Sequence, residues 1–141
     1  MSLPDIRPGL LIHYGFLWSK ERRRGQEQAS KDRPCAVVVA TAQADGGIQT
    51  IVVPVARTPP DDPDAALEVP NSMKRQLGLK PERQWVRLDE LNRFIWPGYD
   101  LARIPGTDHY DYGMIPGPFF RQIKAGIMSL DAKLRKTSDR E

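Results

Sequence analysis

The apolar run from Cys35 to Ala40 constrains the fold of this chain more than any other feature of its sequence. The run holds three successive valines and no charge, and it directly follows Arg33-Pro34. β-Branched residues in a short uncharged run are typical of a strand that is covered on both faces. Proline, with its fixed φ and no N–H, suits the first residue of a strand and disrupts the middle of one. The sequence therefore predicts a buried strand with Arg33 at its rim.

A hairpin is predicted around this strand. Asp45-Gly46-Gly47 is a turn signal between residues 33–43 and a second apolar segment, residues 48–57. Two such segments joined by a turn of this type favour antiparallel pairing. Pro54 lies inside the second segment, and a proline within a sheet is tolerated near an edge or a bulge. We therefore expect the C-terminal end of the second strand to be irregular.

The remaining sequence predicts short strands, long ordered connections and two helices. Residues 9–18 read as the first strand, in which His13 and Tyr14 face opposite sides. Further elements are expected as strands at 65–69, 84–88 and 89–95, a helix at 71–77 with Asn71 as its N-cap and Gly78 as its stop, and an aromatic loop at 96–118. After residue 118, apolar residues recur every three or four positions, which predicts an amphipathic C-terminal helix on the sheet: Phe120, Ile123, Ile127, Leu130 and Leu134.

Length and composition point to one globular domain over residues 1–141. The 141 residues suffice for one core, and the 13 prolines favour short strands and ordered loops over a helical bundle. A single cysteine excludes an internal disulfide and a cysteine-based zinc site. No apolar run approaches the roughly 18 residues of a membrane span, and the N-terminus has no signal-peptide pattern. We expect a cytoplasmic protein without membrane contact.

Positive charge is concentrated in one polar segment. The formal net charge is only +3, which permits a nucleic-acid partner without requiring one. Residues 19–32, however, hold Arg22, Arg23 and Lys31 immediately before Arg33. These side chains are candidates for phosphate contacts, and a solvated loop is the alternative.

The order of these features resembles that of the PemK/MazF-like toxins of type II toxin–antitoxin pairs. The resemblance is carried by residues 9–16, by Gly25 with Glu27 and Gln28, by Arg33-Pro34 with its valine run, by residues 51–55, and by Asp89-Glu90 ahead of Asn92. It implies a mainly β fold with a C-terminal helix, an SH3-like small β-barrel, in a symmetric homodimer. It also implies a toxin that cleaves single-stranded RNA without a metal or other cofactor, and a cognate antitoxin whose acidic tail blocks the groove.

The resemblance assigns roles to particular residues. In RNA cleavage by 2′-OH attack, a site needs a base, an acid and a cation for the charge that develops on phosphorus. Arg33 matches the family's catalytic arginine. Ala56 stands where the family usually has a threonine, which leaves Thr58, two residues later, as the candidate hydroxyl, and Arg57 as a possible second cation. The general base stays open between Glu27, Asp32 and His13.

Two other interpretations remain open at this point. Ala56 allows a non-catalytic module that binds nucleic acid or protein on the same barrel. The gyrase-poisoning toxins share this fold, but no motif here supports that activity. In the loop at 96–118, Tyr99 is a candidate for stacking on an unpaired base, with core packing as the alternative use of such rings.

Overall fold

A two-stranded hairpin forms the centre of the sheet. In the computed structural model, which describes residues 3–29 and 31–140, β2 (Asp32–Ala42) pairs antiparallel with β3 (Ile48–Ala56), as predicted. The Asp45 side chain accepts a bond from the Gly47 N–H at 2.9 Å, and Gly46 takes a positive φ of 90° that glycine adopts without strain. The turn chemistry read from the sequence therefore sets the register of the hairpin.

The prediction of an irregular end after Pro54 is wrong. Pro54 lies opposite Cys35 in regular pairing, and the register shift falls in the partner strand, between Val37 and Val39. On its other edge β3 changes neighbour around the proline. It pairs with β6 through residues 49–52 and with β5 through residues 55–56. Pro54 lies in the interval between these two partners, where the missing N–H interrupts no pairing.

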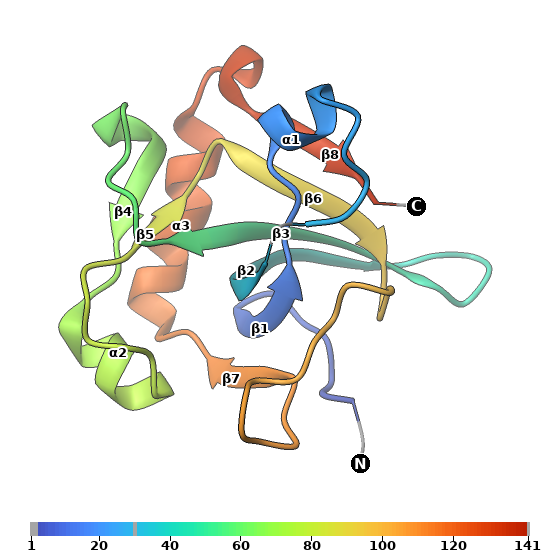
Figure 1. The fold of residues 1–141 in the computed structure, drawn as a ribbon, viewed down its shortest axis with the longest axis horizontal. Helices are drawn as coiled ribbons and strands as arrows, with labels where there is room; N and C mark the ends of the chain where they lie inside the picture. The colour runs from blue at the N-terminus through green and yellow to red at the C-terminus, as the bar shows by residue number, and fades with distance from the viewer. Residues whose placement is uncertain (1–2, 30, 141) are drawn as a thin grey trace.

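The structure is a mainly antiparallel eight-stranded sheet with a C-terminal helix (Figure 1). The main path runs β4-β5-β3-β2-β1-β7; off this path, β6 pairs with β3, and β8 pairs with β6. The other strands are β1 (Leu10–Gly15), β4 (Ala66–Glu68), β5 (Trp85–Arg87), β6 (Glu90–Ile95), β7 (Asp111–Met114) and β8 (Lys136–Asp139). The helices are α1 (Ser19–Arg23), α2 (Asn71–Leu77) and α3 (Gly117–Ser129), with 3-10 turns at Pro63–Ala65 and Ala132–Leu134. Among the described strands, β4 and β7 at the two ends of the path do not pair, so the sheet does not close into a barrel.

Several elements differ from the sequence-based expectation. The helix at Asn71–Leu77 ends at Gly78 as predicted, but Pro70 is its N-cap and Asn71 is its first residue. Short elements also interrupt the predicted loops: α1 lies within residues 19–32, and β7 within 96–118. The C-terminal helix begins two residues early and ends at Ser129, so Leu134 lies outside it and is 47% exposed. The chain then adds β8, a parallel neighbour of β6 that the helical pattern did not predict.

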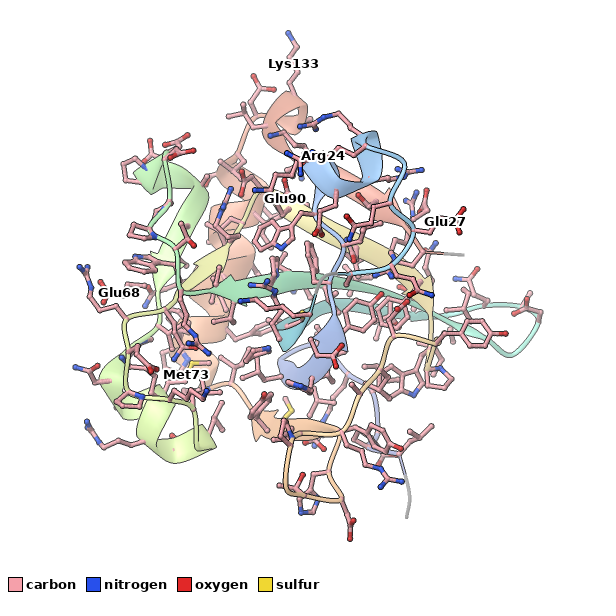
Figure 2. All side chains as sticks on the ribbon, viewed as in Figure 1. Arg24, Glu27, Glu68, Met73, Glu90 and Lys133 are labelled. Carbon is pink, nitrogen blue, oxygen red and sulfur yellow. The ribbon has the colours of Figure 1, made fainter. Side chains whose placement is uncertain are left out.

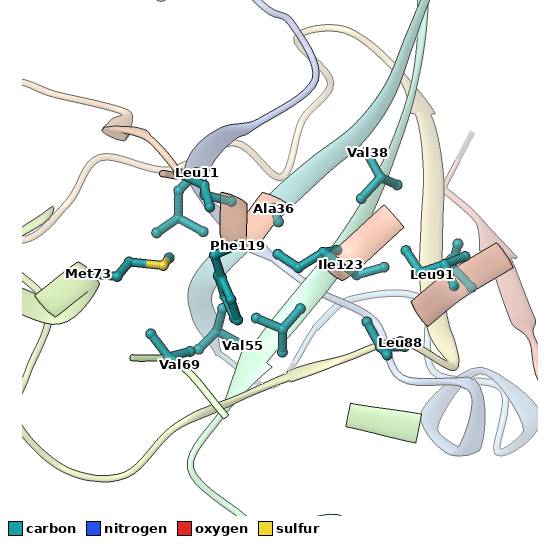
Figure 3. Close-up of a cluster of buried hydrophobic side chains, with 14 of the residues drawn as sticks. Leu11, Ala36, Val38, Val55, Val69, Met73, Leu88, Leu91, Phe119 and Ile123 are labelled. Atoms are coloured by element: carbon teal, nitrogen blue, oxygen red, sulfur yellow. The ribbon is translucent and has the colours of Figure 1, made fainter. Parts of the chain in front are cut away.

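Side chains from β2 are buried on both faces of the sheet. Ala36 and Val38 pack in the cluster that also contains Phe119 and Ile123 of α3, shown in Figure 3. Cys35 and Val37 belong to a second cluster, in which the Tyr14 and Phe94 rings stack with centroids 4.7 Å apart. The prediction of a doubly covered strand is confirmed for residues 35–38, whereas Val39 is 36% exposed. In the described part of the chain, no helix has the length and apolarity that crossing a membrane requires.

The last described residues tie the C-terminus to the opposite end of the chain. Arg140 Nη1 donates to the Gly15 carbonyl at 2.7 Å and to Asn92 Oδ1 at 3.1 Å, and its Nη2 pairs with Asp100 at 2.9 Å. The Arg140 side chain is only 3% exposed. Asn92 in turn exchanges two 2.8 Å bonds with the backbone of Leu17. A buried polar network thus joins β1, β6 and the segment after β8.

Candidate functional site

A cleft of about 530 Å3 lies where β2 begins. Cationic side chains from three separate segments line it: Lys31 and Arg33 at the start of β2, Arg57 after β3, and Lys80 after α2. Asp32, His13, Tyr112, Ile104 and Pro105 line it as well. Four cations against one carboxylate, counted over the described lining residues, concentrate here as much net positive charge as the whole chain carries. Such a cleft attracts anions.

Arg33 is held by an aromatic ring. Its Cζ lies 5.1 Å from the centroid of Trp18, in the range of a cation–π contact. Arg87 also lies over Trp18, at 5.5 Å, and is itself fixed by two bonds to Asp89. Arg33 is half-buried, and burial lowers its pKa, although a guanidinium stays charged. Its Nε is buried and has no hydrogen-bond partner among the described residues.

Trp18 is fixed through the start of α1. The Trp18 N–H donates to Glu21 Oε1 at 3.1 Å, and the next residue, Ser19, donates its N–H and hydroxyl to the Glu90 carboxylate at 2.9 and 2.6 Å. Glu21 and Glu90 are 7% and 5% exposed. Two buried carboxylates therefore fix the backbone at Trp18 and Ser19, and with it the residue whose ring contacts Arg33. Sequence reasoning missed this support, because it placed Trp18 at the end of a strand and Glu21 in a polar loop.

His13 forms a pair with Tyr112 inside the cleft. His13 Nδ1 and the Tyr112 hydroxyl oxygen lie 2.8 Å apart. Burial lowers the pKa of His13, an effect that Asp32 partly opposes, and burial raises the pKa of Tyr112 to about 12. At neutral pH the imidazole is therefore uncharged and the phenol protonated. His13 Nε2 has no hydrogen-bond partner among the described residues, and it is the proton-accepting nitrogen in the tautomer whose Nδ1–H donates to the Tyr112 hydroxyl oxygen.

The predicted site residues divide between this cleft and other surfaces. Asp32, Arg33, Lys31 and Arg57 lie together in the cleft, with His13. A second groove holds three others, Arg22, Glu27 and Tyr99, the last of them 96% exposed. Figure 2 shows Glu27 on the opposite side of the view from Met73 of α2, the helix that directly precedes the cleft residues Gly78 and Lys80.

Two further predicted residues lie in neither of these places. Arg23 is exposed on α1, and Thr58 is exposed beyond the end of β3; neither lines the cleft. Ala56 is buried in β3 opposite Trp85. The cleft therefore contains the predicted arginine and two of the three candidate bases, and lacks the predicted threonine.

Sequence reasoning missed three members of the site: Trp18, Lys80 and Tyr112. Tyr112 belongs to the predicted aromatic loop, which was the only signal for it. Over residues 3–29 and 31–140, no group of three or more His, Cys, Asp or Glu side chains is arranged to hold a metal ion. Comparison of the chain with protein-family models and with curated proteins finds no match.

Proposed function

We propose that this chain is a metal-independent endoribonuclease that cleaves single-stranded RNA, as a toxin of the PemK/MazF type. One observation carries the proposal: a neutral histidine lines the same cleft as four cations, and one of these, Arg33, is held by a rigid strand and a tryptophan. RNA supplies both a proton for such a base and a phosphate for such cations. On this proposal the open sheet is a variant of the SH3-like barrel, extended by β4, α2 and β5.

The chemistry follows from the groups in the cleft. His13 Nε2 takes the proton of the ribose 2′-OH, and the oxygen attacks the adjacent phosphorus. The bond from phosphorus to the 5′-oxygen breaks, the leaving oxygen takes a proton from solvent water, and a 2′,3′-cyclic phosphate remains. Arg33 stabilises the charge on the phosphoryl oxygens, where its forked donors suit two oxygens at once. Asp32 is the alternative base in the cleft.

RNA cleavage in EDTA by variants of Arg33 tests the proposal. Arg33→Ala should lose about a hundredfold or more in rate, as when one preorganised electrostatic contact is removed. Arg33→Lys should restore little, because an ammonium lacks the fork. Arg103→Ala, which removes an exposed arginine outside the cleft, should cleave like the parent. Equal cleavage by the parent and Arg33→Ala contradicts the assignment.

A non-catalytic module that binds nucleic acid is the second candidate. It is favoured by Ala56 and by the place of Thr58, since no hydroxyl from the end of β3 lines the cleft. Under this alternative the parent binds oligonucleotide without cleaving it, and Arg33→Ala lowers both the affinity and its salt dependence.

The proposal includes two protein partners: a second copy of the chain, and an antitoxin with an acidic tail. The positive cleft is complementary in charge to such a tail. Sedimentation over a micromolar concentration range tests the homodimer, and a monomer throughout would contradict it.

A further inference from the structure

The connection after α2 forms one wall of the cleft. Gly78, Leu79, Lys80 and Gln84 line the cleft from this segment. Lys80 is exposed, whereas Gln84 is only 5% exposed. The wall therefore has a cation on its open side and a buried amide behind it.

A buried ammonium holds this wall from behind. Lys74 of α2 is 4% exposed, and its Nζ donates to the carbonyls of Pro81 and Glu82 at 2.9 and 3.1 Å. None of the ion pairs in the described part of the chain includes Lys74. Burying an ammonium without a carboxylate is costly unless polar groups satisfy it, and here backbone carbonyls of the wall do so. The buried charge thus fixes the chain directly after Lys80.

A second buried side chain fixes Lys80 itself. Gln84 Nε2 donates to the Lys80 carbonyl at 2.8 Å, and the Leu79 N–H donates to the Lys74 carbonyl at 2.9 Å. The backbone on both sides of Lys80 is therefore bonded to groups of α2 or of the wall. Such support for one exposed lysine is typical of a side chain whose position matters for binding.

We propose that Lys80 binds a phosphate of the RNA strand, flanking the phosphate at Arg33, and that Lys74 positions it. The inference rests on the proposed function, because it takes RNA as the ligand of the cleft. A wall lysine adds a charge contact to the backbone and no base recognition, so it contributes affinity without sequence preference.

Binding of a 2′-O-methyl tetranucleotide, measured by fluorescence anisotropy against salt concentration, tests the role of Lys80. The methyl group blocks 2′-OH attack, so the measurement does not depend on cleavage. Lys80→Ala should weaken binding about tenfold at low salt, as for one lost charge-assisted contact. It should also reduce the salt slope by about 0.7, the value for one contact to a single strand. An unchanged Kd and slope overturn the assignment.

Lys133→Ala is the matched control. It removes the same charge from an exposed lysine that Figure 2 places at the opposite end of the view from α2. It should bind like the parent. A loss equal to that of Lys80→Ala would show a general charge effect and would overturn the site.

A double-mutant cycle tests the positioning role of Lys74. Lys74→Met should weaken binding in the parent and have no further effect in Lys80→Ala, because Lys74 acts only through Lys80. Gln84→Leu, which removes the other support, should behave in the same way if Lys74→Met does not fold. Additive losses in both cycles overturn the positioning role.

Cleavage of long RNA by the parent separates this inference from the proposed function. If Arg33→Ala abolishes cleavage while Lys80→Ala leaves oligonucleotide binding unchanged, the proposed function is supported and the inference about Lys80 is contradicted. If Lys80→Ala weakens binding but the parent does not cleave RNA, the phosphate contact is supported and the nuclease proposal is contradicted.

Discussion

His13 titrates in surroundings that oppose its protonation. Burial sets its pKa below the ordinary value of 6.5, and Asp32 is the charged neighbour that pulls the other way. If His13 is the base, the cleavage rate should stay high at pH 6.5 and fall only as the pH drops through this lower value. A rate profile between pH 4.5 and 8 measures it. His13→Gln should lose this fall in rate at low pH. His109→Gln, which changes an exposed histidine, should keep it.

The same shift makes a prediction about stability. A group whose pKa is lower in the folded state than in the unfolded state stabilises the fold at pH values above its unfolded-state pKa. That contribution is lost as the pH falls through the folded-state pKa. The free energy of unfolding should therefore decrease below about pH 6.5, and decrease less in His13→Gln. Urea unfolding at a series of pH values tests this, and identical slopes for parent and variant would contradict it.

At the scale of elements, substitutions on the two faces of α3 test whether this helix covers the sheet. Ile127 is 8% exposed in the main core cluster, whereas its neighbour Met128 is 76% exposed. Ile127→Asp buries a charge without a partner and should cost several kcal/mol. Met128→Asp should change stability by less than about 0.5 kcal/mol. Denaturant unfolding of the two variants compares them directly, and equal stabilities would remove α3 from the core.

The sequence predicted an element correctly where the residues that determine it lie close together in the chain. The hairpin, α2 and the buried face of α3 were visible because turn residues and apolar spacing lie within a few residues of one another. The strand β8 was not visible, because Lys136–Asp139 has no apolar alternation. It is held instead by distant groups, such as Arg93, whose Nη2 lies 3.0 Å from Asp139 Oδ2.

At the scale of the molecule, we expect the ion pairs of Arg140 and Arg93 to contribute very different amounts to stability. Arg140 is 3% exposed and bonds to three other segments, so Arg140→Met leaves buried acceptors unpaired and should cost about 3 kcal/mol. Arg93 and Asp139 are 42% and 48% exposed, and Arg93→Met should cost less than about 1 kcal/mol. Thermal unfolding of both variants checks the ranking, and equal losses would contradict it.

The candidate site was predictable only in part, for a reason of the same kind. Arg33 was found because Pro34 marks the start of a strand, and a strand start is a local feature. Trp18, Lys80 and Tyr112 come from segments far apart in the chain, and only the folded sheet brings them to one cleft. Glu27 shows the converse error. It precedes Arg33 closely in the sequence, yet lines a different groove.

Cys35 lies in β2, the strand that carries Arg33, and its thiol allows the opening of this strand to be measured chemically. Its thiol is fully buried, and burial raises its pKa, so the reactive thiolate is absent from the native state. Modification by a thiol reagent therefore requires the hairpin to open, and the labelling rate reports how often it does so. A ligand seated in the cleft stabilises the closed form by mass action and should slow the labelling. The chain's single cysteine thus reports occupancy of the cleft through its labelling rate, and no cysteine has to be introduced by mutation.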